Sequence, residues 1–527
     1  MNMKGAKQPL FVPDSMYLAR IAVASRSTSR WTTRPACWPE RSRDAQRDPF
    51  SPLHRRTVFI GNLTDAEAPK RVLVVGGSGR VGGAVVEQIV RLAQRRGVAN
   101  KLLIDIGGRN QRRGDQTLQR LGQRLHSLTE RSILRNHVQL NWVQDDFPEL
   151  VSLLCQYDLV VHTAGPFQNR GRNAGRLLEA CMLAGVNYQD VADDMHHAET
   201  CRVQHADAAQ RAGITAWIST GIYPGISNLM AADLMSRLPG CSDEQRSACE
   251  RGIEFSYFTA GSGGAGATIL SATYLLLAEP VYTVRNGVLQ WRPAYSDPRR
   301  VDFGIECGGQ RTTYLLNLPE VRSAHSVYGV EHAEARFGTA PALWNGLMWC
   351  MARFLPPAIL RERMAGITVA SLPFVRLVDW LVGARTAVRV DCWQRGEQTR
   401  ASYHDYFLYV HERLTDAVGE CTAAFALARI FPEALGITVP FIPGVWYPEE
   451  VFQTAACRDA LMGLVQTNAL RWEPFSRDSD QSRRTARLVR SQCTKVRNWC
   501  AKQTESLHGT ADVFGTCSIP NRSVPGT

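Results

Sequence analysis

Over residues 70–220, short apolar runs alternate with longer segments of helical periodicity. The run Val72–Val75 predicts a buried strand, and apolar positions then recur at helical spacing from Ala84 to Leu92. Further strands are predicted at 101–106, at 138–143, from 158 onward and at 213–219. This alternation of strand and helix predicts an α/β fold built on an open, doubly wound parallel sheet.

Beyond residue 220 the pattern changes to short alternating strands with a few helices. Strands are predicted at residues 253–259, 281–284, 300–304, 311–316, 388–392 and 403–410. They indicate a second, mixed α+β domain that is largely antiparallel and covers 221–412. A helix and a closing loop in 413–455 are expected to return the chain to the first domain.

Two apolar runs, 343–360 and 367–384, interrupt the second domain, and Pro356-Pro357 separates them. The second run is long enough to span a bilayer, but Pro373, Arg376 and Asp379 interrupt it. We therefore expect either buried helices or helices that contact a membrane surface.

A glycine-rich loop directly follows the first predicted strand. Gly77, Gly79 and Gly82 form G-x-G-x-x-G, and Gly76 begins a second, overlapping frame. Glycine permits a tight turn, close approach of a pyrophosphate and close helix packing, and the free N–H groups of the next helix bind phosphate. The alternative is a strand–helix turn that binds nothing. The predicted dinucleotide contacts in this loop are Gly76, Gly77, Ser78, Gly79, Arg80, Val81 and Gly82.

The end of the second predicted strand indicates which dinucleotide is bound. An NAD site usually has an acid there for the ribose, but here Gly107 and Gly108 are followed by Arg109. A guanidinium suits a 2′-phosphate, so we predict NADP. Asp105 is the competing candidate, but its expected place is inside the strand, facing a helix.

The net charge of +12 resides in the two ends of the chain. Residues 1–58 carry eleven Lys/Arg and four Asp/Glu, net +7, and residues 471–527 carry ten and five, net +5. Residues 59–470 are therefore neutral, which argues against a nucleic-acid partner. The polar, basic segment 471–527 is expected to be a disordered tail.

The leader 1–58 is rich in Arg, Ser and Thr and has one acid, Asp14, before Glu40. This is typical of a transit peptide, so we expect a chloroplast protein, with the mitochondrion as the alternative. A plain disordered extension is the other interpretation. The fourteen cysteines show neither C-x-x-C nor zinc spacing, so we expect no metal and a reducing compartment.

Several further motifs together carry a resemblance to a known family. They are Val74–Gly82, Gly108–Asn110, Ala164–Gln168, Glu179–Cys181, Gly185–Asp190, Gly221–Gly225, Gly261–Thr268 and Gly444–Glu449. With them, residues 70–455 resemble the saccharopine dehydrogenase-like oxidoreductases, and in particular the uncharacterised plastid members. The resemblance implies an NADP-binding Rossmann domain at 69–220. Most of these motifs belong to the cofactor domain, so they specify the fold better than the substrate.

The resemblance also implies roles for residues that follow the later strands. In the family, the loop after the fourth strand lies near the nicotinamide ribose, and here it contains Ala164, Gly165, Pro166 and Phe167. Tyr188, Asp190, Asp193 and Asp194 follow the next helix and could line the same crevice. The candidate catalytic residues are Tyr188, Asp190 and Asp193.

For this acidic cluster, the alternative role is to cap the helix that begins at Met195. His162 lies inside an apolar strand and is expected to be a core histidine rather than a base. The second glycine cluster, Gly261–Gly266, precedes a helix, so Gly263 and Gly264 are candidates to hold a substrate anion. A flexible lid or a plain turn is the alternative there.

The expected function is that of an NADP(H)-dependent oxidoreductase, a homodimer acting on a small molecule. One hypothesis is reduction of an imine to a secondary amine, which a basic pocket would favour. A second is reduction of a carbon–carbon double bond in a lipid or isoprenoid, which an apolar tunnel near 343–384 would favour. A third is NADP(H) binding without turnover, which an occluded nicotinamide site would favour.

Overall fold

The computed structural model describes residues 68–125, 133–168, 170–238, 249–263, 266–396, 402–438 and 441–475. The predicted leader and the part of the predicted tail beyond residue 475 lie outside these ranges, as does Gly264.

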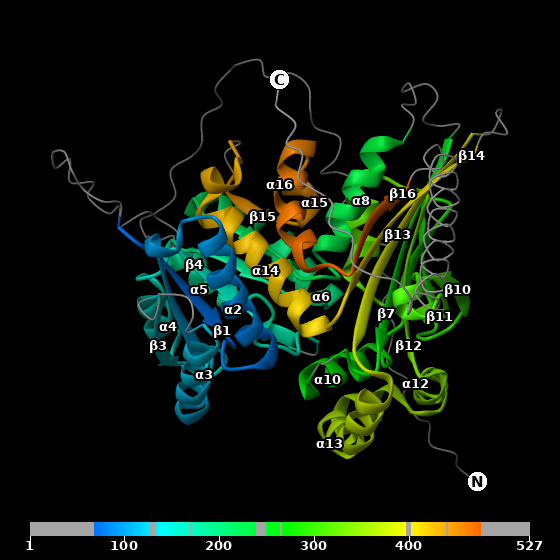
Figure 1. Ribbon diagram of the computed structural model, residues 1–527, viewed down its shortest axis with the longest axis horizontal. Coiled ribbons are helices and arrows are strands. Elements are labelled where there is room, and N and C mark those ends of the chain that lie inside the picture. Colours follow the sequence, from blue (N-terminus) through cyan, green and yellow to red (C-terminus); the bar gives the residue numbers. More distant parts are fainter. Residues whose placement is uncertain are drawn as a thin grey trace, which may run out of the picture. The chain divides into compact units, whose positions relative to one another are not determined.

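A seven-stranded parallel sheet with the strand order β15-β6-β5-β4-β1-β2-β3 forms the first domain (Figure 1). Its strands are β1 (Lys70–Val75), β2 (Leu102–Gly108), β3 (Leu134–Gln139), β4 (Leu159–His162), β5 (Asn187–Asp190), β6 (Thr215–Trp217) and β15 (Gly444–Trp446). β1 and β4 are neighbours within the sheet and have buried side chains on both faces, which explains why their sequences are mostly apolar. The predicted doubly wound α/β fold is confirmed.

Helices connect and cover these strands. They are α2 (Arg80–Arg95), α3 (Gln111–Arg124), α4 (Phe147–Leu154), α5 (Arg176–Ala184), α6 (Met195–Glu199), α7 (Ala206–Ala212) and α14 (Leu414–Ile430). α14 packs along α2, and its Gly419 lies so close that an added Cβ would be 2.9 Å from the backbone carbon of Ala84. The helix that follows the second domain therefore becomes part of the first.

The third strand lies earlier than its predicted position at 138–143. β3 ends at Gln139, and residues 140–143 instead form a loop that lines a cavity. This edge strand, Leu-Arg-Asn-His-Val-Gln, is only partly buried and contains several polar residues. The pattern of apolar residues therefore did not predict its position.

The second sheet has nine strands, and its main path has the order β10-β11-β12-β7-β13-β14-β16, with β8 on β12 and β9 on β8. The strands are β7 (Cys249–Ala260), β8 (Val281–Arg285), β9 (Val288–Arg292), β10 (Arg299–Asp302), β11 (Gln310–Leu315), β12 (His332–Ala340), β13 (Arg385–Gly396), β14 (Ser402–His411) and β16 (Arg471–Phe475). Only β12 and β7 pair in parallel, so the sheet is mixed and largely antiparallel, as predicted.

Helices of the second half surround this sheet. They are α8 (Ile226–Arg237), α10 (Ala267–Leu276), α11 (Pro319–Tyr328), α12 (Ala342–Phe354), α13 (Pro357–Val382), α15 (Pro448–Val451) and α16 (Ala455–Val465). α8 contacts β13 and β14, and Ile253, Phe255 and Tyr257 of β7 belong to the same hydrophobic core as α8. One face of the sheet is therefore apolar.

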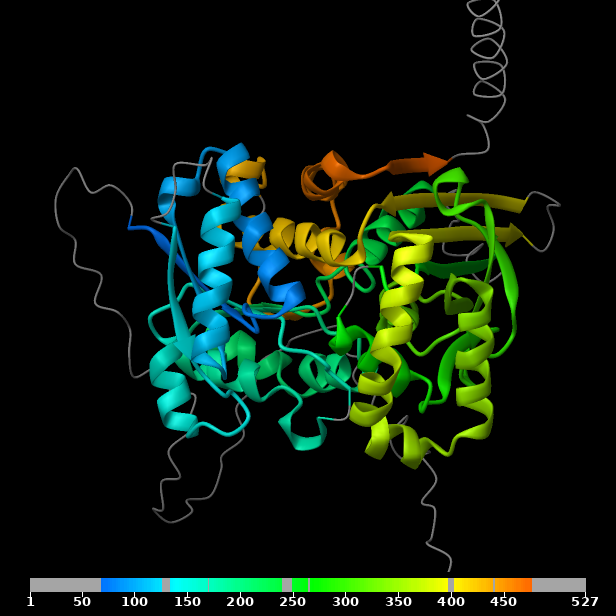
Figure 2. The same cartoon turned by 60° about the horizontal axis from the view of Figure 1, so that its bottom comes forward.

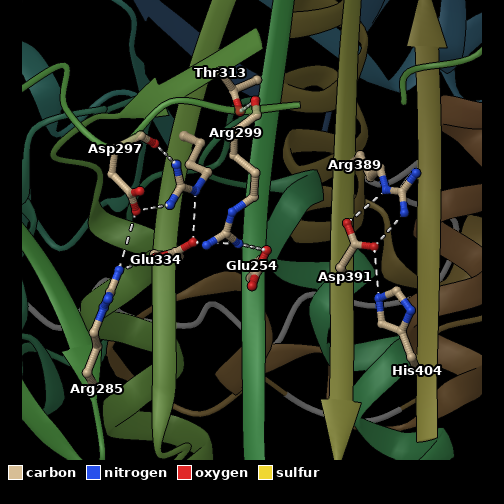
Figure 3. A network of polar contacts seen from close by, with 10 residues as sticks. Glu254, Arg285, Asp297, Arg299, Thr313, Glu334, Arg389, Asp391 and His404 are labelled. Atoms are coloured by element: carbon tan, nitrogen blue, oxygen red, sulfur yellow. Dashed lines mark hydrogen bonds and ion pairs between the residues drawn. The ribbon is translucent and has the colours of Figure 1, made fainter. Parts of the chain in front are cut away.

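The other face carries ion pairs (Figure 3) beside a smaller apolar cluster that includes Phe258, Ala387 and Val410. Arg299 pairs with Glu254 and with Glu334, and Arg336, which is fully buried, pairs with Glu334 and Asp297. A separate group on β13 and β14 joins Arg389, Asp391 and His404. Every buried charge named here has a partner, which is the condition for placing charge at such a position.

Residues 471–475 correct the predicted boundary of the tail. They form β16, which pairs with β14, and Trp472 packs against Phe407 and Tyr409. The charged residues Arg471 and Glu473 of this edge strand make the segment resemble a tail in composition.

Candidate functional site

A cavity of about 710 Å³ lies at the carboxyl ends of the parallel strands. Its wall is formed by the glycine loop after β1 and by the residues that follow β2, β3, β4, β5 and β6. The beginnings of α10 and α14 and two residues of α13, Leu372 and Arg376, complete the wall. β1 lies between β4 and β2, so the cavity is at the point where the strand order reverses, the usual ligand position in such sheets.

The glycine loop has the local geometry of a phosphate cradle. Gly76 has φ +86°, and an added Cβ would be 2.8 Å from the backbone of Ala164. A Cβ on Gly82 would overlap Gly76 O and lie 2.6 Å from Thr163 Oγ1. Gly79, in contrast, would meet only Gly76 O, at 3.0 Å, and as the N-cap of α2 it has no capping side chain. The N–H groups at the start of α2 are therefore available for an anion.

Six of the seven predicted loop residues line the cavity, namely Gly76, Ser78, Gly79, Arg80, Val81 and Gly82. Gly77 does not, because it packs against β2, where an added Cβ would be 2.7 Å from Ile106 Cβ. Gly77 therefore supports the fold of the loop without forming part of the cavity wall.

The cation predicted to hold a 2′-phosphate is in place. Arg109 is exposed at the end of β2 and lines the cavity, together with Arg113 in the first turn of α3. The competing Asp105 does not line the cavity. It is buried, and its carboxylate accepts hydrogen bonds from Tyr157 OH at 3.0 Å and from Asn136 N at 3.0 Å. The positive charge at this end of the cavity fits a phosphorylated ribose.

The loop after β4 also lies in the cavity wall, with all four predicted residues, Ala164, Gly165, Pro166 and Phe167. Arg170, which the sequence analysis did not single out, holds this loop. Its guanidinium donates to Ala164 O at 2.6 Å and to Pro166 O at 3.1 Å, and lies 4.0 Å from the ring centroid of Phe167. The loop is thus fixed from behind.

Two of the three predicted catalytic residues are buried behind this wall. Tyr188 OH donates to Asp190 Oδ2 at 3.1 Å and is 2.9 Å from His162 Nδ1. Asp190 Oδ1 accepts from the amides of Ser219 and Ala192. Neither Tyr188 nor Asp190 lines the cavity, and both are almost inaccessible to solvent. This placement argues against a catalytic role for either residue.

Burial raises the pKa of Tyr188 well above its ordinary value and lowers the pKa of His162, so both side chains stay neutral. His162 is therefore a satisfied core histidine, as its place in an apolar strand indicates. Asp190, His197 and Cys201 also come close enough together to hold a metal ion. Since both oxygens of Asp190 already accept hydrogen bonds from the protein, we interpret this group as part of the same buried network.

Asp193 is the predicted catalytic residue that lies in the cavity wall. Gln168 Nε2 donates to its Oδ1 at 3.0 Å, and burial raises the pKa of its carboxyl group. Its neighbour Asp194 caps α6 by accepting from His197 N at 2.6 Å, the capping role weighed for this cluster. Asp193 alone of these acids is placed to reach a ligand.

A smaller pocket of about 70 Å³ adjoins the cavity, and Asp193, Tyr223, Ile269 and Leu414 belong to the walls of both. Its other lining residues are largely apolar and include Leu270, Leu316, Phe337, Trp344 and Met348. Tyr223 stacks on Tyr257 with ring centroids 4.4 Å apart, and burial raises its pKa. The sequence analysis included Tyr223 in the Gly221–Gly225 motif but gave it no role, because its stacking partner Tyr257 lies in the other sheet.

The second glycine cluster lies at this junction, but Gly263 does not line either pocket. Its carbonyl accepts from Leu414 N at 2.8 Å, and an added Cβ would be 2.5 Å from Thr259 Cγ2. Ser262 donates through both its N and its Oγ to Asp379 of α13, at 2.6 Å each. Gly266 does line the large cavity, next to Arg80. The predicted anion site at Gly263 therefore finds no support, whereas the start of α10 does face the cavity.

Comparison with known proteins identifies the first domain. Residues 72–217 match the family model of the saccharopine dehydrogenase NADP binding domain. This match extends from β1 to β6 and confirms both the resemblance for the cofactor domain and NADP as its cofactor. Residues 72–217 are thus an NADP-binding domain of the saccharopine dehydrogenase type. No curated protein matches the chain.

Solved structures show more distant similarity over a larger part of the chain. Apo histidine-tagged saccharopine dehydrogenase (L-Glu forming) from Saccharomyces cerevisiae is 13% identical, with a TM-score of 0.48, and the match covers 77% of this chain and 100% of that chain. For DAP dehydrogenase of C. glutamicum in complex with DAP, the values are 13%, 0.36, 76% and 99%. For an engineered D-amino acid dehydrogenase bound to NADP+, they are 13%, 0.36, 73% and 94%. We draw no conclusion about substrate or reaction from similarities at this level.

Proposed function

We propose that the chain is an NADP(H)-dependent oxidoreductase in which Asp193 holds the proton that accompanies hydride transfer. The observation that carries this proposal is the position of Asp193, where the large cavity meets the small apolar pocket. Bound NADPH supplies a hydride. Reduction of a double bond also needs a proton, for the nitrogen of an imine or for the second carbon of a carbon–carbon double bond.

The surroundings of Asp193 suit a proton donor. Burial raises the pKa of its carboxyl group, which favours the protonated form. Gln168 donates to Oδ1, which leaves Oδ2 as the oxygen that can carry a proton. Tyr223 is the other acidic group common to both pockets. The ordinary pKa of tyrosine is already well above neutral pH and burial raises it, so Tyr223 keeps its proton. Of these two groups, Asp193 is therefore the one that we propose as the proton donor.

The small pocket favours reduction of a carbon–carbon double bond in a lipid or isoprenoid. Trp344 and Met348 of α12 line it, within the apolar segment 343–384. Apolar walls attract apolar substrate groups and offer them no hydrogen bonds.

One observation supports the alternative, reduction of an imine to a secondary amine. Arg376 of α13 lines the large cavity on the side of the second domain. A guanidinium there could hold the carboxylate of an amino-acid imine, because bidentate pairing with carboxylates is its usual role. The two substrate classes thus depend on different walls of the cavity.

The proposal is tested with the full-length protein. Metabolites that accumulate in a deletion strain or line are added to the protein with NADPH, and NADPH oxidation is measured. Asp193→Asn is expected to lower turnover by roughly 10²–10⁴ while NADPH affinity is retained. The control is Asp115→Asn, an exposed acid of α3 outside the cavity. Unchanged turnover in Asp193→Asn would exclude this acid, and lack of NADPH binding by the wild type would exclude the oxidoreductase.

Two further variants separate the substrate classes. Arg376→Ala should raise KM if the substrate carries a carboxylate and should leave KM unchanged if it does not. Met348→Ala should raise KM for an apolar substrate, because it removes part of the apolar wall.

A further inference from the structure

Helices α12 and α13 expose an unusually apolar surface. Eleven of the nineteen exposed large apolar side chains in the described residues lie between 342 and 382, although this segment is a small part of the chain. They are Leu343, Leu347, Trp349, Phe354, Ile359, Val369, Phe374, Leu377, Trp380, Leu381 and Val382. Patches of this kind on a water-soluble surface mark interaction sites. We call this surface the α12–α13 face.

The two helices form one continuous surface. They lie side by side, as Figures 1 and 2 show, and the rings of Trp344 and Phe374 are 5.4 Å apart between them. Trp380, near the end of α13, is 79% exposed. Tryptophan is enriched where protein meets the interface of a bilayer, because its ring is apolar and its N–H is polar.

The charged residues on these two helices indicate what kind of partner the α12–α13 face binds. In the segment 342–382, the exposed charged residues are Arg353, Arg361, Arg363, Arg376 and a single acid, Glu362. Arg361 donates to Ala278 O and Arg376 lines the cavity, so Arg353 and Arg363 are the arginines left for the outer surface. The other acid, Asp379, accepts two hydrogen bonds from Ser262 and is directed into the protein. Apolar side chains with a surplus of guanidinium groups complement a membrane that contains anionic lipid.

The same charge argues against other occupants. A two-fold dimer through this face would place its arginines opposite their own copies, which is unfavourable. The segments 1–58 and 471–527, with net charges of +7 and +5, would also be repelled. An anionic lipid surface is the partner that these features fit.

The contacts between α13 and the rest of the protein indicate whether this helix can cross a membrane or only lie on its surface. Among the described residues, α13 alone is long and apolar enough to span a bilayer, and 17% of its apolar window is buried. One side of it is bound to α10 by hydrogen bonds from Tyr274 OH to Ser371 and between Ser271 and Thr368. A helix tied to a globular domain in this way cannot insert across the bilayer, but its opposite side can enter the interface.

We propose that the α12–α13 face docks on a membrane surface containing anionic lipid. α13 also lines the cofactor cavity through Leu372 and Arg376. Docking therefore holds one wall of the cavity next to the bilayer. The proposal concerns the surface alone and does not depend on the reaction.

The test is flotation of the full-length protein with vesicles of phosphatidylcholine, with or without phosphatidylserine. The wild type is expected to float with the mixed vesicles and to dissociate from them as salt is raised. Leu377→Ser combined with Trp380→Ser should weaken binding roughly tenfold or more, because apolar contact area is lost. Val203→Ser, at an apolar position between α6 and α7 whose exposure lies between those of Leu377 and Trp380, is the control and should bind like the wild type.

Charge-reversal variants test the electrostatic contribution to membrane binding. Arg353→Glu with Arg363→Glu should weaken binding to the mixed vesicles, whereas Arg112→Glu on the exposed side of α3 should not. Thermal melting and NADPH binding should stay unchanged in all of them. Failure of the wild type to float would overturn the proposal. Light scattering that shows a dimer broken by the Leu377 and Trp380 changes would assign the face to a second copy.

Discussion

At the scale of single residues, Arg109 and Asp105 show why cofactor preference depends on small displacements along a strand. Asp105 points into the protein and is fully used by Tyr157 and Asn136, whereas Arg109, just beyond the strand, reaches the cavity. Arg109→Ala should therefore reduce NADPH affinity by roughly 1–3 kcal/mol, the scale of a charge-assisted hydrogen bond. NADH affinity should barely change, because NADH lacks the 2′-phosphate. Titration calorimetry with both cofactors measures the difference.

Arg112→Ala is the control for this prediction, since Arg112 is exposed on the same helix as Arg113 but does not line the cavity. An equal loss of affinity for NADPH and NADH in Arg109→Ala would contradict the assignment of a 2′-phosphate partner.

Two glycines of the same loop should respond differently to substitution. Gly79 has ordinary φ and an added Cβ would meet only one atom, so Gly79→Val should fold normally and block the phosphate path. Gly82→Val should lower the melting temperature of the protein itself, because the side chain would overlap Gly76 O. Thermal melting with and without NADPH distinguishes them. Stabilisation of Gly79→Val by NADPH would mean that the loop does not hold the cofactor.

Local motifs predicted the contacts that lie within one loop, and they failed where contacts come from across the fold. The loop Gly76–Gly82 and Arg109 belong to a strand–turn–helix unit whose geometry is set locally. Tyr188 and Asp190 lie inside β5, and their side chains are used in a buried hydrogen-bond network with His162. The spacing of acidic residues in the sequence does not show which of them the fold will bury.

At the scale of elements, β12 was not predicted, although strands that also carry charge, at 300–304 and 388–392, were. β12 contains Glu334 and Arg336 on one side, which neutralise each other and the charges of Arg299 and Asp297. Their mutual pairing makes them compatible with a central strand. Ala333, Ala335 and Phe337 do alternate with the polar positions, but alanine is a weak indicator of a strand.

The crossing of α2 and α14 depends on one glycine. An added Cβ on Gly419 would be 2.9 Å from the backbone of Ala84, and backbone cannot move aside cheaply. Gly419→Ala should therefore cost about 1–3 kcal/mol of unfolding free energy, despite the higher helix propensity of alanine. Denaturant unfolding of the full-length protein gives this difference.

Gly463 of α16 provides the matched comparison, because an added Cβ there would meet nothing within 4 Å. Gly463→Ala should stabilise the protein by roughly 0.5–1 kcal/mol through helix propensity alone. If both substitutions stabilised the protein equally, the close approach of α14 to α2 would be wrong.

At the scale of the whole molecule, the chain passes repeatedly between its two sheets. After the second sheet, β15 pairs with β6 in the first, and β16 then pairs with β14 in the second. The sequence indicated the first return through the helix at 415–431. The second return was not predictable, because Arg471–Phe475 gains its apolar contacts only from residues far away in the chain.

A pair of buried acids lies where these passages meet. Glu320 of α11 accepts from Tyr257 OH of β7 at 2.6 Å and from Ser227 Oγ of α8 at 3.2 Å. Glu449 of α15 accepts from Asn228 Nδ2 of α8 at 2.9 Å. Burial, together with repulsion from Glu449 in the case of Glu320, raises the pKa of each carboxyl group to about 7. Both acids thus bind protons more tightly in the folded protein than in the unfolded chain.

This proton binding predicts how stability depends on pH. A raised folded-state pKa contributes stability that is complete below the ordinary glutamate pKa of 4.5 and is lost as pH rises through about 7. The unfolding free energy should therefore fall between about pH 5 and pH 8, and Glu320→Gln should make this fall shallower by keeping the side chain neutral. Denaturant titrations across this range test the slope. Glu331→Gln, a change at a partly exposed acid that follows α11, should leave the slope as in the wild type. A Glu320→Gln slope as steep as the wild-type slope would show that the buried pair does not titrate in this window.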